Sequence, residues 1–122
     1  MMVRAIRGAI TVEQNQAEEI LSATRQMLAA ILSRNPDLRV DDLVSALFTL
    51  TPDLNAVFPA LAARQMGWNQ VPMMCAQEIP VPGALPQCIR VMLHWNTSLP
   101  ASQVQHVYLG EAVRLRPDLL QS

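Results

Sequence analysis

The side chains best suited to chemistry in this sequence are arginines that stand singly within apolar segments. All nine basic residues are arginine. A guanidinium stays charged at any working pH and offers a planar fork of N–H donors that matches a carboxylate. Arg7 and Arg90 lie in apolar stretches, where a cation requires a partner or a ligand. They predict a site for a small anion, although an ion pair between one of them and Glu78 is an alternative.

Other catalytic and binding patterns are weaker. Neither His94 nor His106 has another potential metal ligand at short spacing in the sequence, so we expect no metal. A cysteine in an apolar segment, such as Cys75, is more often a buried thiol than a nucleophile. The sequence contains no glycine-rich phosphate loop and no run of arginines that would follow a nucleic-acid backbone. We therefore expect no cofactor and no nucleic-acid partner.

The length and composition predict one domain, residues 1–122. Apolar residues make up 51% of the chain and charged residues only 16%, so we expect another subunit to cover part of the apolar surface. No window reaches the ~18 uncharged apolar residues of a membrane span. The two cysteines form no paired motif and the first residues do not resemble a secretory signal, so we expect free thiols and a cytoplasmic location.

Hydrophobic periodicity predicts the elements that position these side chains. We expect strands over 2–12, 43–50, 71–79, 88–97 and 104–109, and helices over 16–34 and 59–66. This order predicts an α+β fold, in which a mixed or mostly antiparallel sheet of about five strands is covered on one face by two helices.

Individual residues refine these expectations. Asn15 followed by Glu18 predicts a capping box at the first helix, and Gly67 is expected to end the second. Gly8 marks either a bulge or a close approach within the first strand. The alternation over 88–97 places Arg90 on the face opposite Ile89. The arginine is therefore expected on the side of the sheet away from the core.

Over residues 1 to about 119 the sequence resembles the small monofunctional chorismate mutases of the Bacillus type. The matching stretches are MMVRAIRGAITVE at the start, TPDLNAVFPALAAR at 51–64, GWNQVPMMCAQEIPVPGALPQCIRVM at 67–92 and HVYLGEAVRLRPDL at 106–119. The resemblance implies an intramolecular Claisen-type rearrangement of chorismate to prephenate, in phenylalanine and tyrosine biosynthesis, without a cofactor. It also implies a homotrimer that forms a pseudo-α/β barrel with active sites at the subunit interfaces.

The resemblance also implies the residues of the site. Arg90 would stabilise charge on the ether oxygen, Arg7 would bind a carboxylate, and Glu78 would take the ring hydroxyl. Further substrate contacts are implied for Phe58, Ala60, Arg64, Met74, Cys75, Ala76, Gln77, Tyr108, Leu115 and Arg116, of which the last two belong to a C-terminal flap over about 110–122. The sequence departs from the family at Leu61, where a lysine is common, and at Met74, where a smaller polar residue is common.

Two other classes of protein fit the same architecture. A trimeric metabolite sensor or an enamine-type hydrolase would also use an arginine in an interfacial cleft, and fold alone does not decide between them. A purely structural trimer is a further alternative, but unpaired buried cations are costly unless a ligand or partner compensates them. The joint presence of Arg7, Glu78, Arg90 and Tyr108 in matched contexts favours the mutase.

Overall fold

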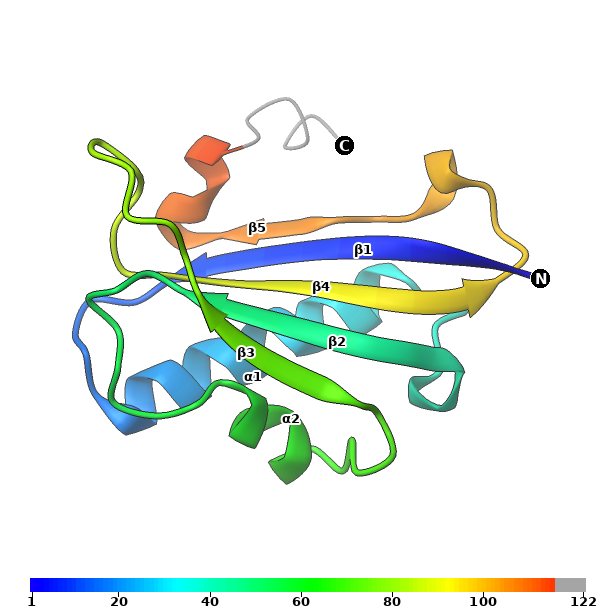
Figure 1. Cartoon of the computed structure of the whole chain (residues 1–122). Helices are drawn as coiled ribbons and strands as arrows, with labels where there is room; N and C mark the ends of the chain where they lie inside the picture. Colours follow the sequence, from blue (N-terminus) through cyan, green and yellow to red (C-terminus); the bar gives the residue numbers. More distant parts are fainter. Residues whose placement is uncertain (116–122) are drawn as a thin grey trace.

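The computed structural model describes residues 1–115, and its centre is a five-stranded mixed sheet in the order β3-β2-β4-β1-β5 (Figure 1). The strands are β1 (Met2–Thr11), β2 (Leu43–Leu50), β3 (Met73–Gln77), β4 (Cys88–Thr97) and β5 (Val107–Leu109). The helices are α1 (Ala17–Arg34) and α2 (Ala60–Gln65), with 3₁₀ turns η1 (Val40–Asp42), η2 (Ala101–Gln103) and η3 (Gly110–Leu115). Both helices cover the same face of the sheet (Figure 1). The predicted α+β fold is therefore confirmed.

The antiparallel pair β1 and β4 runs the full length of both strands, from Met2 opposite Thr97 to Thr11 opposite Cys88. Strand β2 pairs antiparallel with the other side of β4, and the edge strands β3 and β5 run parallel to β2 and β1. Both edge strands are shorter than the ranges 71–79 and 104–109 predicted from the sequence. At β3 the reason is Pro72, which precedes the strand and has no N–H to donate to a ladder.

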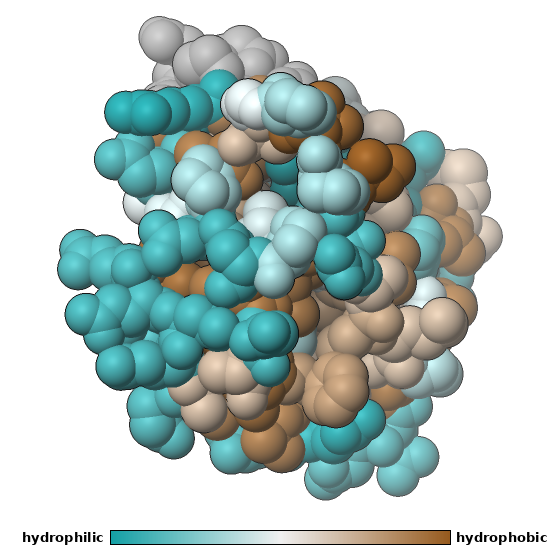
Figure 2. Space-filling model, turned by 60° about the vertical axis from the view of Figure 1, so that its left-hand side comes forward, coloured by the Kyte–Doolittle hydropathy of each residue, from teal (hydrophilic) through white to brown (hydrophobic). Residues whose placement is uncertain are grey.

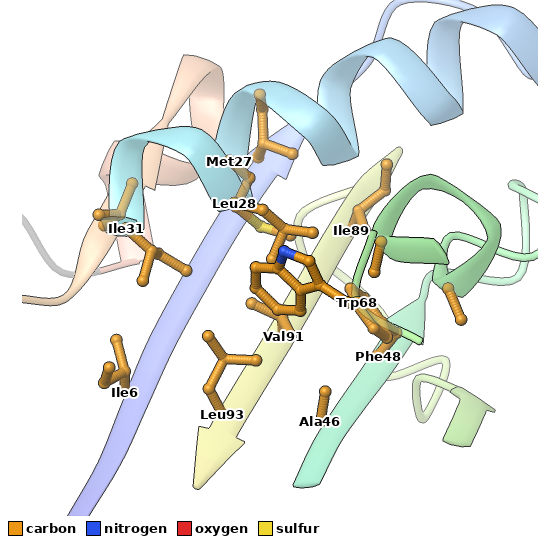
Figure 3. Close-up of a cluster of buried hydrophobic side chains, with 14 of the residues drawn as sticks. Ile6, Met27, Leu28, Ile31, Ala46, Phe48, Trp68, Ile89, Val91 and Leu93 are labelled. Carbon is orange, nitrogen blue, oxygen red and sulfur yellow. The ribbon is translucent and has the colours of Figure 1, made fainter. Parts of the chain in front are cut away.

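The main hydrophobic core lies between the sheet and the two helices. Ile89, Val91, Leu93 and Trp95 of β4 are all buried in it, as the alternation over 88–97 predicts. Figure 3 shows Trp68, from the loop after α2, lying among side chains of α1 and of the central strands. Because one face of β4 is committed to this core, its other face is free to carry polar residues. None of the helices within residues 1–115 is long and apolar enough to cross a membrane.

Asn15 does not cap helix α1, so the predicted capping box is wrong. The N-cap residue is Gln16, and no side chain makes a capping hydrogen bond there. Asn15 Oδ1 instead accepts the backbone N–H groups of Asn55 and Ala56 at 3.0 and 3.1 Å. The side chain therefore ties the loop before α2 to the start of α1, a long-range contact that local spacing does not reveal.

Gly8 allows α1 to pack closely against β1. The pairing with β4 continues through Gly8 without a shift in register, so this glycine marks a close approach rather than a bulge. A Cβ atom built on Gly8 would lie 2.8 Å from Ile31 Cδ1, 3.1 Å from Val91 Cγ1 and 3.2 Å from Met27 Cγ. A side chain at this position would force the side chains of Ile31, Val91 and Met27 to repack.

We predict that Gly8→Ala lowers the free energy of unfolding by about 1–3 kcal/mol, the usual cost of overpacking a core. Urea unfolding followed by circular dichroism measures the change. Ile31→Val removes the Cδ1 atom that the new methyl group would meet, so it should restore part of the stability in the Gly8→Ala background. An unchanged free energy of unfolding in the single variant would contradict the close packing described here.

Candidate active site

The polar residues predicted for catalysis meet on the face of the sheet that the helices leave uncovered. They line a cavity of about 240 Å³, which we call the arginine cleft. Its polar lining comes from Arg7, Thr49, Glu78, Arg90 and Tyr108, and its apolar walls include Ala9, Leu47 and Met92. Figure 2 turns the end of the sheet where β1, β2 and β3 finish toward the viewer, and shows hydrophilic side chains beside apolar ones. The cleft therefore combines charge with a partly apolar wall.

The register of the sheet explains how residues distant in sequence reach one cleft. Thr49, Arg90, Ala9 and Tyr108 are successive cross-strand partners on β2, β4, β1 and β5, so they form one row across the sheet. Arg7 lies two residues before Ala9, and side chains two residues apart in a strand share a face. Ala9 is almost fully buried, with 1% of its surface exposed. Its small side chain separates Arg90 from Tyr108.

Arg90 and Glu78 form a partly buried ion pair in the cleft. Arg90 Nε lies 3.4 Å from Glu78 Oε1, with 38% and 21% of the two side chains exposed. The geometry is not that of a hydrogen bond, and among residues 1–115 Arg90 Nε is the one buried side-chain nitrogen or oxygen without a hydrogen-bond partner. Buried donors are nearly always satisfied in folded proteins. Arg90 is therefore not locked in a complete ion pair with Glu78, and its partly exposed guanidinium keeps hydrogen-bonding capacity for a ligand.

Glu78 is held in place from two directions. Its backbone N–H donates to Leu50 O at 2.8 Å, which continues the pairing of β3 with β2 by one residue. The hydroxyl of Thr49 donates a hydrogen bond to Glu78 Oε2. Sequence reasoning did not single out Thr49. It lies within the strand predicted over 43–50, but only the register of β2 against β4 places it opposite Arg90.

A second and larger cavity lies outside the arginine cleft. We call it the Phe58 pocket, and it measures about 510 Å³ and is lined by residues 50–52, 54–58 and 75–77. Phe58 is 70% exposed. Cys75 pairs with Phe48 of β2 and packs against the main core, so it faces away from the arginine cleft. Within one chain, Cys75 and Glu78 therefore do not share a cavity.

The remaining predicted contact residues are scattered. Ala60 is buried in the main core, Arg64 is exposed on α2, and Met74 is 70% exposed on β3. Leu115, at the end of η3, packs against a small cluster that includes Ala9 and Tyr108. Arg116 and the rest of the predicted flap beyond Leu115 lie outside the described residues. The structure of one chain thus joins Arg7, Glu78, Arg90 and Tyr108 in one cleft and places Leu115 against the cluster that includes Tyr108. The other described contact residues lie elsewhere.

Each of the two histidines has a hydrogen-bond partner on another segment of the chain. His94 Nδ1 lies 3.0 Å from Ser45 Oγ, and His106 Nδ1 accepts the backbone N–H of Arg7 at 2.9 Å. The second bond fastens β1, at Arg7, to the segment that leads into β5. In the part of the chain that the structure describes, no group of three or more His, Cys, Asp or Glu side chains is arranged to hold a metal ion.

Cys88 lies two residues before Arg90 on the same face of β4, in the small cluster with Ala9, Tyr108 and Ala112. Its side chain is fully buried. This burial raises the pKa of the Cys88 thiol, and the negative charge of Glu78 adds to the effect, although the Arg90 guanidinium opposes it. Cys88 therefore stays protonated at neutral pH and serves the packing of this small cluster beside Arg90.

An α+β sheet whose open face gathers two arginines, a tethered carboxylate and a tyrosine defines a small protein with a cleft suited to an anion. Comparison with known proteins gives the family. The sequence profile described as Chorismate mutase type I matches residues 3–119. Two curated relatives named Chorismate mutase AroH are similar. The one from Thermus thermophilus is 54% identical over 118 residues, covering 97% of each chain. The one from Bacillus subtilis is 51% identical over 120 residues, covering 98% of this chain and 94% of that one.

The solved structures agree. A chorismate mutase from Clostridium thermocellum is similar with a TM-score of 0.87 and 50% sequence identity, covering 89% of this chain and 96% of that one. Relatives at this identity over nearly the whole chain leave no doubt of common ancestry. The chain therefore belongs to the type I chorismate mutases, and the family predicted from the sequence is confirmed.

We predict that Cys88 reacts with iodoacetamide at neutral pH only after the protein unfolds, because the thiolate is the nucleophile and a buried thiol forms little of it. Peptide mapping by mass spectrometry, before and after unfolding in urea, measures the labelling. Cys75 is only half-buried and gives an internal comparison. Rapid labelling of Cys88 in the native protein would show that the cluster beside Arg90 opens readily.

Proposed function

We propose that this protein is a chorismate mutase that rearranges chorismate to prephenate in phenylalanine and tyrosine biosynthesis, by electrostatic stabilisation and preorganisation of its substrate. Family membership supports the activity. The observation that carries the mechanism is Arg90 Nε, a buried donor in the arginine cleft without a hydrogen-bond partner among residues 1–115. We also propose a cytoplasmic location, which suits two free cysteines.

The chemistry of the reaction explains why such a cleft is sufficient. Chorismate is a dianion, and its rearrangement breaks a carbon–oxygen bond while forming a carbon–carbon bond in one pericyclic step. The step needs no nucleophile and no proton transfer. A protein accelerates it by holding the side chain of the substrate over the ring in reactive geometry and by stabilising the negative charge that develops on the ether oxygen. Fixed donors perform both tasks.

Arg90 is assigned to the ether oxygen and to a neighbouring carboxylate. Its interaction strengthens as charge builds in the transition state, which is the condition for raising the rate rather than only the affinity. Glu78 accepts a hydrogen bond from the ring hydroxyl and thereby orients the ring, so it is not a general base. Arg7 and Tyr108 bind the carboxylates, and Arg116 is proposed to assist them from beyond the described residues. No cofactor takes part in this scheme.

We further propose that the active unit is a homotrimer in which the Phe58 pocket of one copy completes the arginine cleft of its neighbour. In one chain the cleft holds only the charged half of the predicted site, while Phe58 and Cys75 line a separate cavity. Apolar side chains are also exposed on the open face of the sheet, among them Val3 at 54% and Met74 at 70%. Packing of sheets against one another would cover these residues.

We predict that Arg90→Ala lowers kcat/KM by a factor of at least 10²–10³, or about 3–4 kcal/mol, the usual loss for one well-placed donor in a dry site. Arg90→Lys should lose nearly as much, because it keeps the charge but not the planar fork. The fall in ultraviolet absorbance as chorismate is consumed measures the rate. Arg39→Ala is the matched control, since the Arg39 side chain is 77% exposed. Full activity in Arg90→Ala would refute the proposed mechanism.

We predict that two inactive variants restore activity when they share a trimer. Arg90→Ala disables the arginine cleft, and Phe58→Glu places an anion where a dianion must bind. Co-expression with two different tags and tandem purification yields mixed trimers, in which some clefts combine an intact Arg90 with a neighbour's intact Phe58. Those sites should turn over chorismate.

The control pair is Arg90→Ala with Arg7→Ala. Arg7 and Arg90 line the arginine cleft of the same chain. If the neighbouring chain supplies only the Phe58 pocket, every cleft in the mixed trimer lacks one of the two arginines and activity is not restored. Sedimentation velocity verifies that every mixture is trimeric. Restored activity in the control pair as well, or activity in a monomeric form, would contradict the shared site.

A further inference from the structure

Thr49 occupies the place in the sheet from which the Glu78 carboxylate is held. It is the cross-strand partner of Arg90 on one side and of Ala76 on the other. Ala76 precedes Glu78 by two residues on the same face, so the three side chains of Thr49, Glu78 and Arg90 converge on one wall of the arginine cleft. The Glu78 carboxylate is held by its contacts with the side chains of Thr49 and Arg90.

The two oxygens of Glu78 have different partners. Oε2 accepts the hydrogen bond of the Thr49 hydroxyl, while Oε1 lies 3.4 Å from Arg90 Nε without hydrogen-bond geometry. A carboxylate beside a guanidinium ordinarily forms two parallel hydrogen bonds with it. The Thr49 hydroxyl engages one of the oxygens that such a pair would use. Glu78 and Arg90 are therefore adjacent without neutralising each other fully.

We propose that Thr49 is a positioning residue, whose hydroxyl keeps Glu78 turned toward the substrate and prevents it from closing a bidentate ion pair with Arg90. The proposal rests on the role assigned to Glu78 under the proposed function. Without the hydroxyl, Glu78 rotates onto Arg90. The substrate then loses its hydroxyl acceptor, and the developing charge on the ether oxygen loses part of its donor.

This mechanism predicts effects on both kinetic constants. The misdirected acceptor weakens binding of the ground state and raises KM. The engaged guanidinium gives up part of an interaction that is strongest in the transition state, so kcat falls. We expect Thr49→Val, which keeps the shape but not the hydroxyl, to lower kcat/KM about 10-fold, as for loss of a hydrogen bond to a charged group. Thr49→Ser keeps the hydroxyl and should stay within about twofold of the parent protein.

A double-mutant cycle with Glu78→Ala separates positioning from a merely structural role. If Thr49 acts through Glu78, Thr49→Val should cause no further loss of kcat/KM in the Glu78→Ala background, whereas independent effects would multiply. Urea unfolding and sedimentation of all four proteins establish that each is folded and assembled like the parent.

Four results would overturn the proposal. Full activity in Thr49→Val beside a large loss in Glu78→Ala would mean that the carboxylate positions itself. Losses that multiply in the double variant, or a failure of Thr49→Ser to retain activity, would mean that Thr49 acts through packing. Full activity in Glu78→Ala would refute the role assigned to Glu78 under the proposed function, and the positioning role of Thr49 with it. The other results refute the role of Thr49 alone, so the two failures are distinguishable.

Discussion

The structure depends on the placement of one guanidinium on a β-sheet whose other face is the hydrophobic core. A charge so close to apolar surface is tolerated only if a partner compensates it. Arg90 has such a partner in Glu78, but their contact at 3.4 Å leaves Arg90 Nε without a hydrogen bond among the described residues. Under the proposed mechanism, this incomplete pairing leaves the guanidinium available to an anionic substrate. A complete ion pair would be a structural feature rather than a binding site.

The two faces of the sheet divide structure from function at single-residue spacing. On β4, Ile89 and Val91 belong to the main core while Arg90 between them faces the cleft. The neighbouring strand repeats the division. Gly8 has no side chain and admits helix α1 on one face, and Ala9 carries only a methyl group between Arg90 and Tyr108 on the other. Small residues on β1 therefore set both the thickness of the core and the width of the cleft.

The same division would link the proposed active site to the proposed assembly. A sheet with helices on one face only must cover its other face or expose apolar side chains to water. The arginine cleft opens on that uncovered face, so a subunit that packs there also closes the cleft. A pocket with a low dielectric constant strengthens each charged contact. Assembly would thereby increase the electrostatic effect of Arg90 on the reaction, in addition to supplying the residues of the Phe58 pocket.

The sequence by itself determined the elements and the chemical character of the site. Alternation over 88–97 fixed which face Arg90 occupies, because side chains in a strand alternate strictly. Separated matches to one family pointed to Arg7, Arg90 and Glu78 as candidates, and these three residues do line one cleft. Local spacing failed at Asn15, whose side chain binds Asn55 forty positions away. Only the tertiary structure decided that Thr49 lies opposite Arg90 and holds Glu78, and that Cys75 faces away from Glu78 within one chain. The physical reason is that strand register and order arise from contacts between distant segments, which no local pattern of residues encodes.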